Sequence, residues 1–172
     1  SYENAKSANN YGVELDIRKS LDFIGLRNFS LSLNGALIHS RVNFAKGSRN
    51  ENRHMQGQSP YLINAGLFYN NEQQQLVVSL LYNRIGKRII GVGRSEGSSA
   101  SEDNARVPDS YEMPRNVIDL SISKKFGDHL EIKANIRDLL AQSVSYKQFD
   151  DVTLKNGTSK EVKQITRQYK PG

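Results

Sequence analysis

The sequence lacks the residues that several common kinds of functional site require. Its 172 residues include no cysteine and no tryptophan, and its three histidines stand far apart, at positions 39, 54 and 129. Without cysteine the chain can form no disulfide, no thiolate nucleophile and no cysteine-based zinc site. The histidines do not fall at the spacing of metal ligands. We therefore expect neither a metal site nor a cofactor.

Long hydrophobic runs are also missing. No apolar stretch approaches the roughly 18 residues of a transmembrane helix, and residues 1–10 lack the basic and apolar regions of a signal peptide. Hydrophobic residues make up only 37% of the chain. The chain could still cross a membrane with β-strands, because a transmembrane β-strand needs only about 9–11 residues and only every second one must be apolar.

The charge is positive but dispersed. A net charge of +6 suits an anionic partner such as nucleic acid or lipopolysaccharide. However, the local groups of cations are interrupted by apolar residues at strand spacing; these groups are Arg84, Lys87 and Arg88, and Lys160, Lys163, Arg167 and Lys170. This pattern favours a solvated strand face or a barrel rim over a nucleic-acid-binding stripe. We expect no nucleic-acid partner.

Alternation of apolar and polar residues is the strongest signal in the sequence. Residues 61–69 and 76–83 each alternate with period two, and the polar run 70–75 joins them without glycine or proline. This pattern predicts two antiparallel strands and a tight turn. The same period recurs at 11–21, 29–37, 117–123, 130–137 and 162–170, and the weaker pattern at 143–149 can extend the strand at 130–137. The sequence therefore predicts an all-β fold of about seven strands.

The connections between these strands sort by length. Short joins at 22–28, 70–75 and 126–129 alternate with long polar ones at 45–59, 92–115 and about 141–160. Antiparallel strands with short turns at one end and long loops at the other are typical of outer-membrane β-barrels. An odd number of strands leaves open edges, which tend to pair with other chains. We therefore expect an antiparallel meander that is part of a larger transmembrane barrel and that can self-associate through its edges.

Five stretches carry a more specific pattern. They are NNYGVELDIRKSL (9–21), ENRHMQGQSPYLINAGLFYNN (51–71), YNRIGKRIIGVG (82–93), MPRNVIDLSISKKFG (113–127) and LEIKANIRDLLAQ (130–142). In their order and spacing they resemble the C-terminal part of the barrel of TonB-dependent outer-membrane receptors. The resemblance covers nearly the whole chain, with 92–115 and 150–160 outside it.

The resemblance implies a location and a function. Residues 1–172 would form the C-terminal portion of a barrel of about 22 strands, with the plug domain and the last strand absent. The parent would lie in the bacterial outer membrane, in contact with lipid and lipopolysaccharide. It would take up a siderophore complex, cobalamin, or a glycan or peptide fragment, driven by TonB acting through the plug. The alternative that we weigh is a soluble β-sandwich or open-barrel binding module, in which the apolar face is internal.

Candidate functional residues are few. Glu14 and Asp16 share a strand face, but solvation in a lumen explains them better than a glycosidase pair does. The glycine-rich run 91–97 does not have phosphate-loop spacing, and no serine has a histidine nearby for activation. We expect no enzyme and no catalytic residue. The regions expected to touch the ligand are the loops 45–59 and 92–115.

Two surface features suit a membrane interface. Tyr61, Tyr69 and Tyr82 lie near predicted strand ends, where either an aromatic girdle or ordinary cross-strand packing explains them. Arg84, Lys87 and Arg88 are candidate contacts for lipopolysaccharide phosphates.

Overall fold

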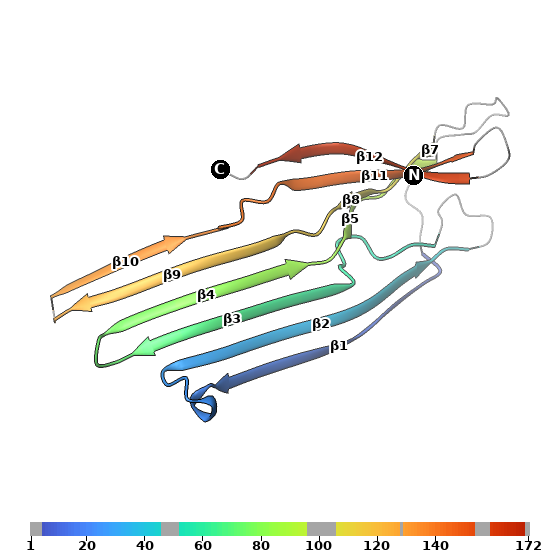
Figure 1. The fold of residues 1–172 in the computed structure, drawn as a ribbon. Coiled ribbons are helices and arrows are strands. Elements are labelled where there is room, and N and C mark those ends of the chain that lie inside the picture. The colour runs from blue at the N-terminus through green and yellow to red at the C-terminus, as the bar shows by residue number, and fades with distance from the viewer. Residues whose placement is uncertain (1–4, 46–51, 96–105, 128, 154–158, 171–172) are drawn as a thin grey trace.

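The structure is all-β apart from one short helical turn. A computed structural model describes residues 5–45, 52–95, 106–127, 129–153 and 159–170 (Figure 1). Within these ranges every strand pair is antiparallel. The helical turn η1 (Asp22–Ile24) lies in the first short connection and ends at Gly25, whose φ of 82° is readily adopted only by glycine.

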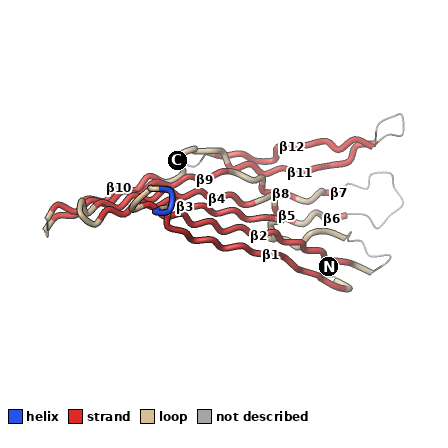
Figure 2. Tube along the Cα trace, turned by 60° about the horizontal axis from the view of Figure 1, so that its bottom comes forward, coloured by secondary structure: helices blue, strands red, loops and turns tan. Residues whose placement is uncertain are grey.

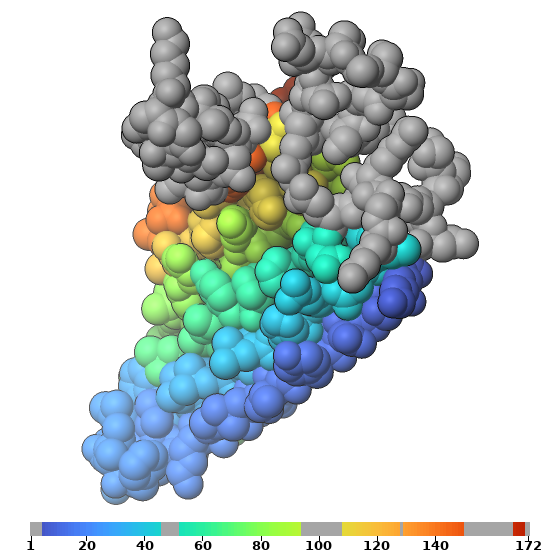
Figure 3. Space-filling model, turned by 90° about the vertical axis from the view of Figure 1, so that its right-hand side faces the viewer, coloured from blue at the N-terminus to red at the C-terminus, as the bar shows by residue number. Residues whose placement is uncertain are grey.

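The largest sheet of the described chain has six strands in the order β1-β2-β3-β4-β9-β10. Their bounds are β1 (Ser7–Ser20), β2 (Phe29–Asn43), β3 (Tyr61–Asn71), β4 (Leu76–Ile85), β9 (Asn116–Phe126) and β10 (Leu130–Ile136). Every neighbouring pair except β4 and β9 is consecutive in the chain, and Figure 3 shows the first strands succeeding one another across the surface. The fold is therefore an up-and-down meander.

Two smaller sheets continue this meander along the strand direction. The first has the order β12-β11-β8-β5 and the second pairs β6 with β7. Their bounds are β5 (Arg88–Gly91), β6 (Arg94–Ser95), β7 (Arg106–Val107), β8 (Ser110–Glu112), β11 (Val144–Thr153) and β12 (Ser159–Tyr169). Because β4 leads into β5 and β8 leads into β9, the pairs β4–β9, β5–β8 and β6–β7 form one long hairpin. Figures 1 and 2 show the smaller sheets beside the larger one and not stacked on it.

The structure confirms the predicted strands and corrects two predicted loops. Three short turns lie at one end of the sheet, and the β2–β3, β6–β7 and β11–β12 connections lead from the other end (Figure 1). The predicted loop 92–115 contains β6, β7 and β8, and the predicted connection 141–160 contains all of β11. The prediction was wrong there because Gly91, Gly93, Pro108 and Pro114 interrupt the alternation.

A break between β10 and β11 is held by side chains. Asp138 and Ala141 have positive φ angles of 51° and 43°. Arg115 forms an ion pair with Asp138, and the amide oxygen of Gln142 accepts a hydrogen bond from the Asn116 backbone N–H at 2.8 Å. These contacts explain why the strand pattern weakens from residue 139 onward.

One face of the six-stranded sheet is apolar over its whole width. The strand register places Leu15, Gly35 and Ile63 opposite one another on this face of β1, β2 and β3. The face continues through β4, β9 and β10 with Leu80, Leu120, Ile122, Ala134 and Ile136. Many of these side chains are exposed, as Val13 at 75% and Leu37 at 68% illustrate.

The described chain has almost no core of its own. Apart from glycines, only Ile89, Val144 and Ser40 are buried among the described residues. The accessible surface is 13106 Å², whereas a compact monomer of 19.4 kDa exposes about 8,500 Å². The uncovered apolar face of a single layer of strands contributes to this difference. An exposed apolar surface of this extent marks a site of contact with protein or lipid.

The opposite face is mixed, with Leu62 and Leu81 on the same side as a row of asparagines. Asn34, Asn64 and Asn83 stand opposite one another on β2, β3 and β4. Asn83 donates its side-chain N–H to Asn64, Asn64 donates to Asn34 at 3.2 Å, and Asn34 donates to Glu14 Oε1 at 2.9 Å. We call these four residues the asparagine ladder. It links four strands by hydrogen bonds across the face that is predicted to be polar.

We expect Asn64→Ala to destabilise the chain more than Asn70→Ala does. Asn64 both donates to and accepts from a neighbouring strand, so its loss removes two hydrogen bonds, at a cost of about 1–2 kcal/mol. Asn70 lies on the same strand and is exposed. Denaturant midpoints of the two variants, followed by far-ultraviolet circular dichroism, measure the difference. Equal losses would show that the ladder contributes nothing specific.

Candidate functional site

The candidate site lies where the connection 52–60 folds onto the sheet. Arg53 forms a β-bridge with Val42. The Gly57 N–H donates to the Ile89 carbonyl at 2.8 Å, and the Ile38 N–H donates to the Pro60 carbonyl at 2.9 Å. The connection therefore bridges β2 and β5, and it supplies hydrogen-bond partners to an edge of β5 that β8 does not occupy.

The conformation of residues 56–60 allows the connection to dock on β5. Gly57 has φ of 80°, which lets the chain turn toward β5. The Gln56 side-chain amide donates to the Ile90 carbonyl at 2.9 Å, and the Ser59 hydroxyl donates to the Tyr61 carbonyl at 2.8 Å. The QGQSP stretch thus has a structural role at the start of β3, because it docks the connection on β5.

The described chain buries side chains mainly beneath this connection. Ile89 is 2% exposed and Ser40 is 3% exposed. The Met55 N–H donates to Ser40 Oγ at 3.3 Å, and the His54 Nδ1 lies 2.9 Å from the Ser40 carbonyl oxygen. A carbonyl can only accept, so this geometry assigns a proton to Nδ1.

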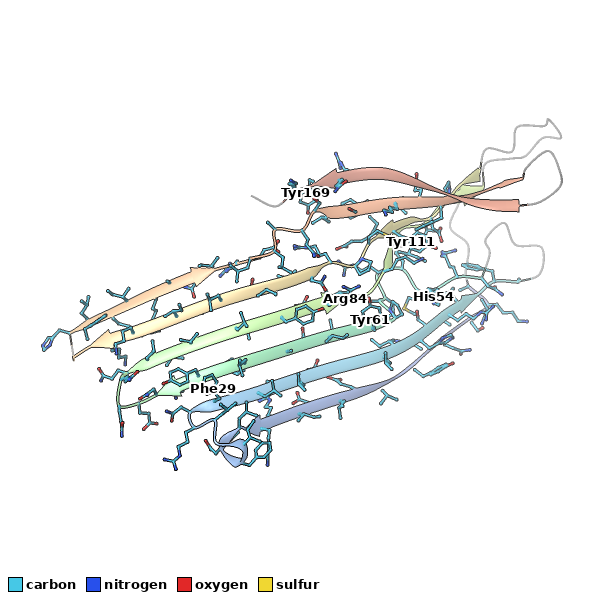
Figure 4. The ribbon with its side chains drawn as sticks, in the orientation of Figure 1. Phe29, His54, Tyr61, Arg84, Tyr111 and Tyr169 are labelled. Carbon is cyan, nitrogen blue, oxygen red and sulfur yellow. The ribbon has the colours of Figure 1, made fainter. Side chains whose placement is uncertain are left out.

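A partly enclosed cavity of about 140 Å³ lies under the connection. We call it the His54 cavity. Its lining residues come from β2, from the connection, from the link between β4 and β5, and from β5 and β8; they are Ile38, Ser40, His54, Gln58, Pro60, Lys87, Arg88, Ile89 and Tyr111. Figure 4 shows His54 and Tyr111 at the end of the sheet from which the longer connections lead.

Lys87 is held over aromatic rings at the margin of this cavity. Its ammonium lies 4.6 Å from the centroid of the Tyr111 ring and 4.8 Å from that of the Phe149 ring. The two rings meet edge to face at 5.4 Å. Cation–π attraction therefore fixes the position of the charge.

A second group of polar residues lies on the apolar face, nearer the centre of the sheet. Arg84 Nε donates to the Tyr61 hydroxyl at 3.2 Å, and Arg84 Nη1 donates to Asn116 Oδ1 at 2.6 Å. The Tyr82 hydroxyl donates to the same Asn116 oxygen at 2.8 Å. Tyr61 and Arg84 point toward one another in Figure 4.

Comparisons with family models, with curated proteins and with solved structures gave no significant match to this chain.

The structure separates the three cations that the sequence groups together. Arg84 lies on the apolar face beside Tyr61, whereas Lys87 lines the His54 cavity on the opposite face. Arg88 borders that cavity and holds Glu112 through Nε at 3.0 Å and Nη2 at 2.8 Å. Strand alternation between positions 84 and 87 is the signal that could have found this separation.

Both regions predicted to touch ligand contribute to the His54 cavity. Connection 45–59 supplies His54 and Gln58, and region 92–115 supplies Tyr111. Residues 46–51 and 96–105 lie outside the described residues. Sequence reasoning missed Ser40, Ile38 and Ile89, because nothing in the local alternation marks them as neighbours.

The remaining candidates have ordinary surroundings. Glu14 accepts from Asn34, and Asp16 pairs with Arg18 at 3.4 Å on an exposed strand. In the described part of the chain, no cluster of three or more His, Asp or Glu side chains could hold a metal ion. The same residues contain no helix that is both long and apolar enough to cross a membrane.

We expect Gly86→Ala to disturb the docking of connection 52–60. A methyl group at this position would lie 2.8 Å from Ser59 Oγ and 2.8 Å from the Tyr61 ring, which are too close. Overpacking of this kind costs roughly 1–3 kcal/mol. The matched control is Gly91→Ala, whose new methyl group would meet its nearest atom at 3.5 Å. Unfolding midpoints measure both, and an unchanged Gly86→Ala midpoint would contradict the packing described here.

Proposed function

We propose that this chain is a segment of an outer-membrane β-barrel whose apolar sheet face contacts lipid and whose polar face lines a water-filled lumen. The exposed apolar face over six strands is the observation that carries this proposal. Opposite it, the asparagine ladder and Glu14 place amides and a carboxylate where a lumen would hydrate them. Apolar-out and polar-in alternation is the defining pattern of transmembrane barrels.

Aromatic residues at both ends of the apolar face support the same reading. Phe29 and Tyr69 pack at 4.8 Å at the short-turn end, and Tyr61 and Tyr82 surround Arg84 toward the other end. The span from Tyr61 to Tyr69 is roughly 27 Å along the strand, of the same order as the apolar band of about 25 Å in outer-membrane barrels. Aromatic rings with polar tips suit the two lipid–water interfaces.

The open edges support membership of a larger barrel. All 14 residues of β1 are exposed, and among the described residues β1 pairs only with β2. At the other side, within the part of the chain that the structure describes, β12 pairs only with β11. Long unpaired edges are costly to leave open, and closure into a barrel removes them. Further strands of a parent chain would satisfy both edges.

The receptor class rests on the resemblance of five sequence stretches to TonB-dependent receptors. On that reading the parent imports a scarce nutrient such as a siderophore complex, cobalamin, or a glycan or peptide fragment, with TonB acting through a plug domain. Arg84, whose guanidinium lies on the apolar face, is the favoured contact for lipopolysaccharide phosphate. Lys87 is better placed for ligand in the lumen.

A soluble β-sandwich or open-barrel binding module is the second candidate. It requires a second layer to cover the apolar face, and the smaller sheets of the described chain extend the large sheet along its strands without covering it (Figure 1). The exposure of this face therefore favours lipid as its environment.

A tryptophan reporter distinguishes the two candidates. The chain contains no tryptophan, so Leu80→Trp and Ser79→Trp each create a single fluorophore, on the apolar and the polar face of β4. We expect brominated phospholipid acyl chains to quench the fluorescence of Leu80→Trp strongly and that of Ser79→Trp weakly, because adjacent strand residues face opposite sides.

The matched pair also controls for misfolding, since a disordered chain would give similar quenching at both positions. Equal quenching, or a monodisperse chain that melts cooperatively in plain buffer without detergent, would sink the membrane proposal in favour of the soluble module.

A further inference from the structure

We propose that the His54 cavity binds a small ring-bearing carboxylate, such as a monocyclic aromatic acid, as part of a larger ligand or alone. This inference treats the cavity as a subsite for an imported nutrient and therefore rests on the proposed function. The argument uses the size of the cavity, the apolar residues that line it and the charges at its margin.

The size of the cavity suits one ring. Its volume is about 140 Å³, and a protein cavity of about 150 Å³ lined by apolar side chains accommodates benzene. The connection 52–60 and strands β2, β5 and β8 supply its walls. Backbone hydrogen bonds from Gly57 and Ile38 hold those walls together, so the cavity is formed before a ligand arrives.

The floor of the cavity is apolar. The middle of this face carries the asparagine ladder, whereas the cavity presents Ile38, Ile89 and Pro60. Ile89 is the most buried hydrophobic side chain of the described residues. Such an apolar floor suits the contact with an apolar ring.

The charges at the margin select for an anion. The lining residues include Lys87 and Arg88 but no aspartate or glutamate. Tyr111 and Phe149 hold the Lys87 ammonium in place by cation–π contact, and no acidic side chain among the described residues pairs with it within 4.0 Å. Arg88 is already bound to Glu112, so Lys87 is the cation that would meet a carboxylate. A cationic ligand would be repelled by both.

The test measures binding of benzoate and its uncharged analogue benzyl alcohol to the folded chain in detergent micelles by titration calorimetry. We expect saturable benzoate binding, with benzyl alcohol about tenfold weaker, since a charge-assisted contact is worth about one order of magnitude in affinity. Lys87→Met should weaken benzoate about tenfold and leave benzyl alcohol unchanged. Lys87→Arg, which keeps the charge, should retain most of the affinity for benzoate.

Lys19→Met is the matched control. The Lys19 ammonium also lies over an aromatic ring, 5.5 Å from the Phe23 centroid, but at the opposite end of the sheet. Its substitution should not change benzoate affinity. An equal loss in Lys19→Met and Lys87→Met would overturn the inference by showing an effect of surface charge alone. The inference would also be overturned if the wild-type protein bound neither benzoate nor benzyl alcohol, or bound both with equal affinity.

The failure of this inference is separable from failure of the proposed function. Quenching of the Leu80→Trp variant by lipid, in a chain that does not bind benzoate, would overturn only the carboxylate site. Benzoate binding in a chain whose Leu80→Trp fluorescence is not quenched would support the cavity as a binding site and overturn its place in a membrane receptor.

Discussion

The structure depends on one constraint: a continuous antiparallel sheet must satisfy its backbone hydrogen bonds while its apolar face has nothing in the described chain to cover it. Backbone pairing runs without interruption from β1 to β10, and three short turns keep successive strands adjacent. Hydrophobic burial within the chain contributes little, because Ile89 and Val144 are the only buried hydrophobic side chains among the described residues. Stability must therefore come largely from whatever meets the apolar face, which is lipid in the function proposed above.

The polar face has an organisation of its own. In its middle, the asparagine ladder links β1 to β4 through side-chain amides whose geometry follows from strand register. At the end where the longer connections begin, connection 52–60 replaces this polar surface with the His54 cavity. This face thus changes along the strands from the asparagine ladder to a cavity with an apolar floor and a cationic margin.

Much of the fold could be predicted from alternation because register and face are periodic properties. The strands β3 and β10 begin where the pattern begins, and the hairpin of β3 and β4 has the predicted turn. The prediction failed at β6, β7 and β8, where two or three residues form each strand between glycines and prolines. So short a segment has no detectable period, and β8 forms a strand only because β5 and β11 lie beside it.

The sequence by itself determined the all-β class and the two faces of each strand, since both follow from the two-residue repeat of a strand; the row of asparagines depends on the register between strands, which the structure supplied. The sequence also identified Arg84, Lys87 and Arg88 as candidate contacts for an anionic partner. Only the tertiary structure decided that Lys87 faces the cavity while Arg84 lies beside Tyr61 on the other face. It alone decided that 52–60 docks on β5 and buries Ile89 and Ser40. The physical reason is that these contacts join residues about 15 to 30 positions apart, and local periodicity carries no information about such pairings.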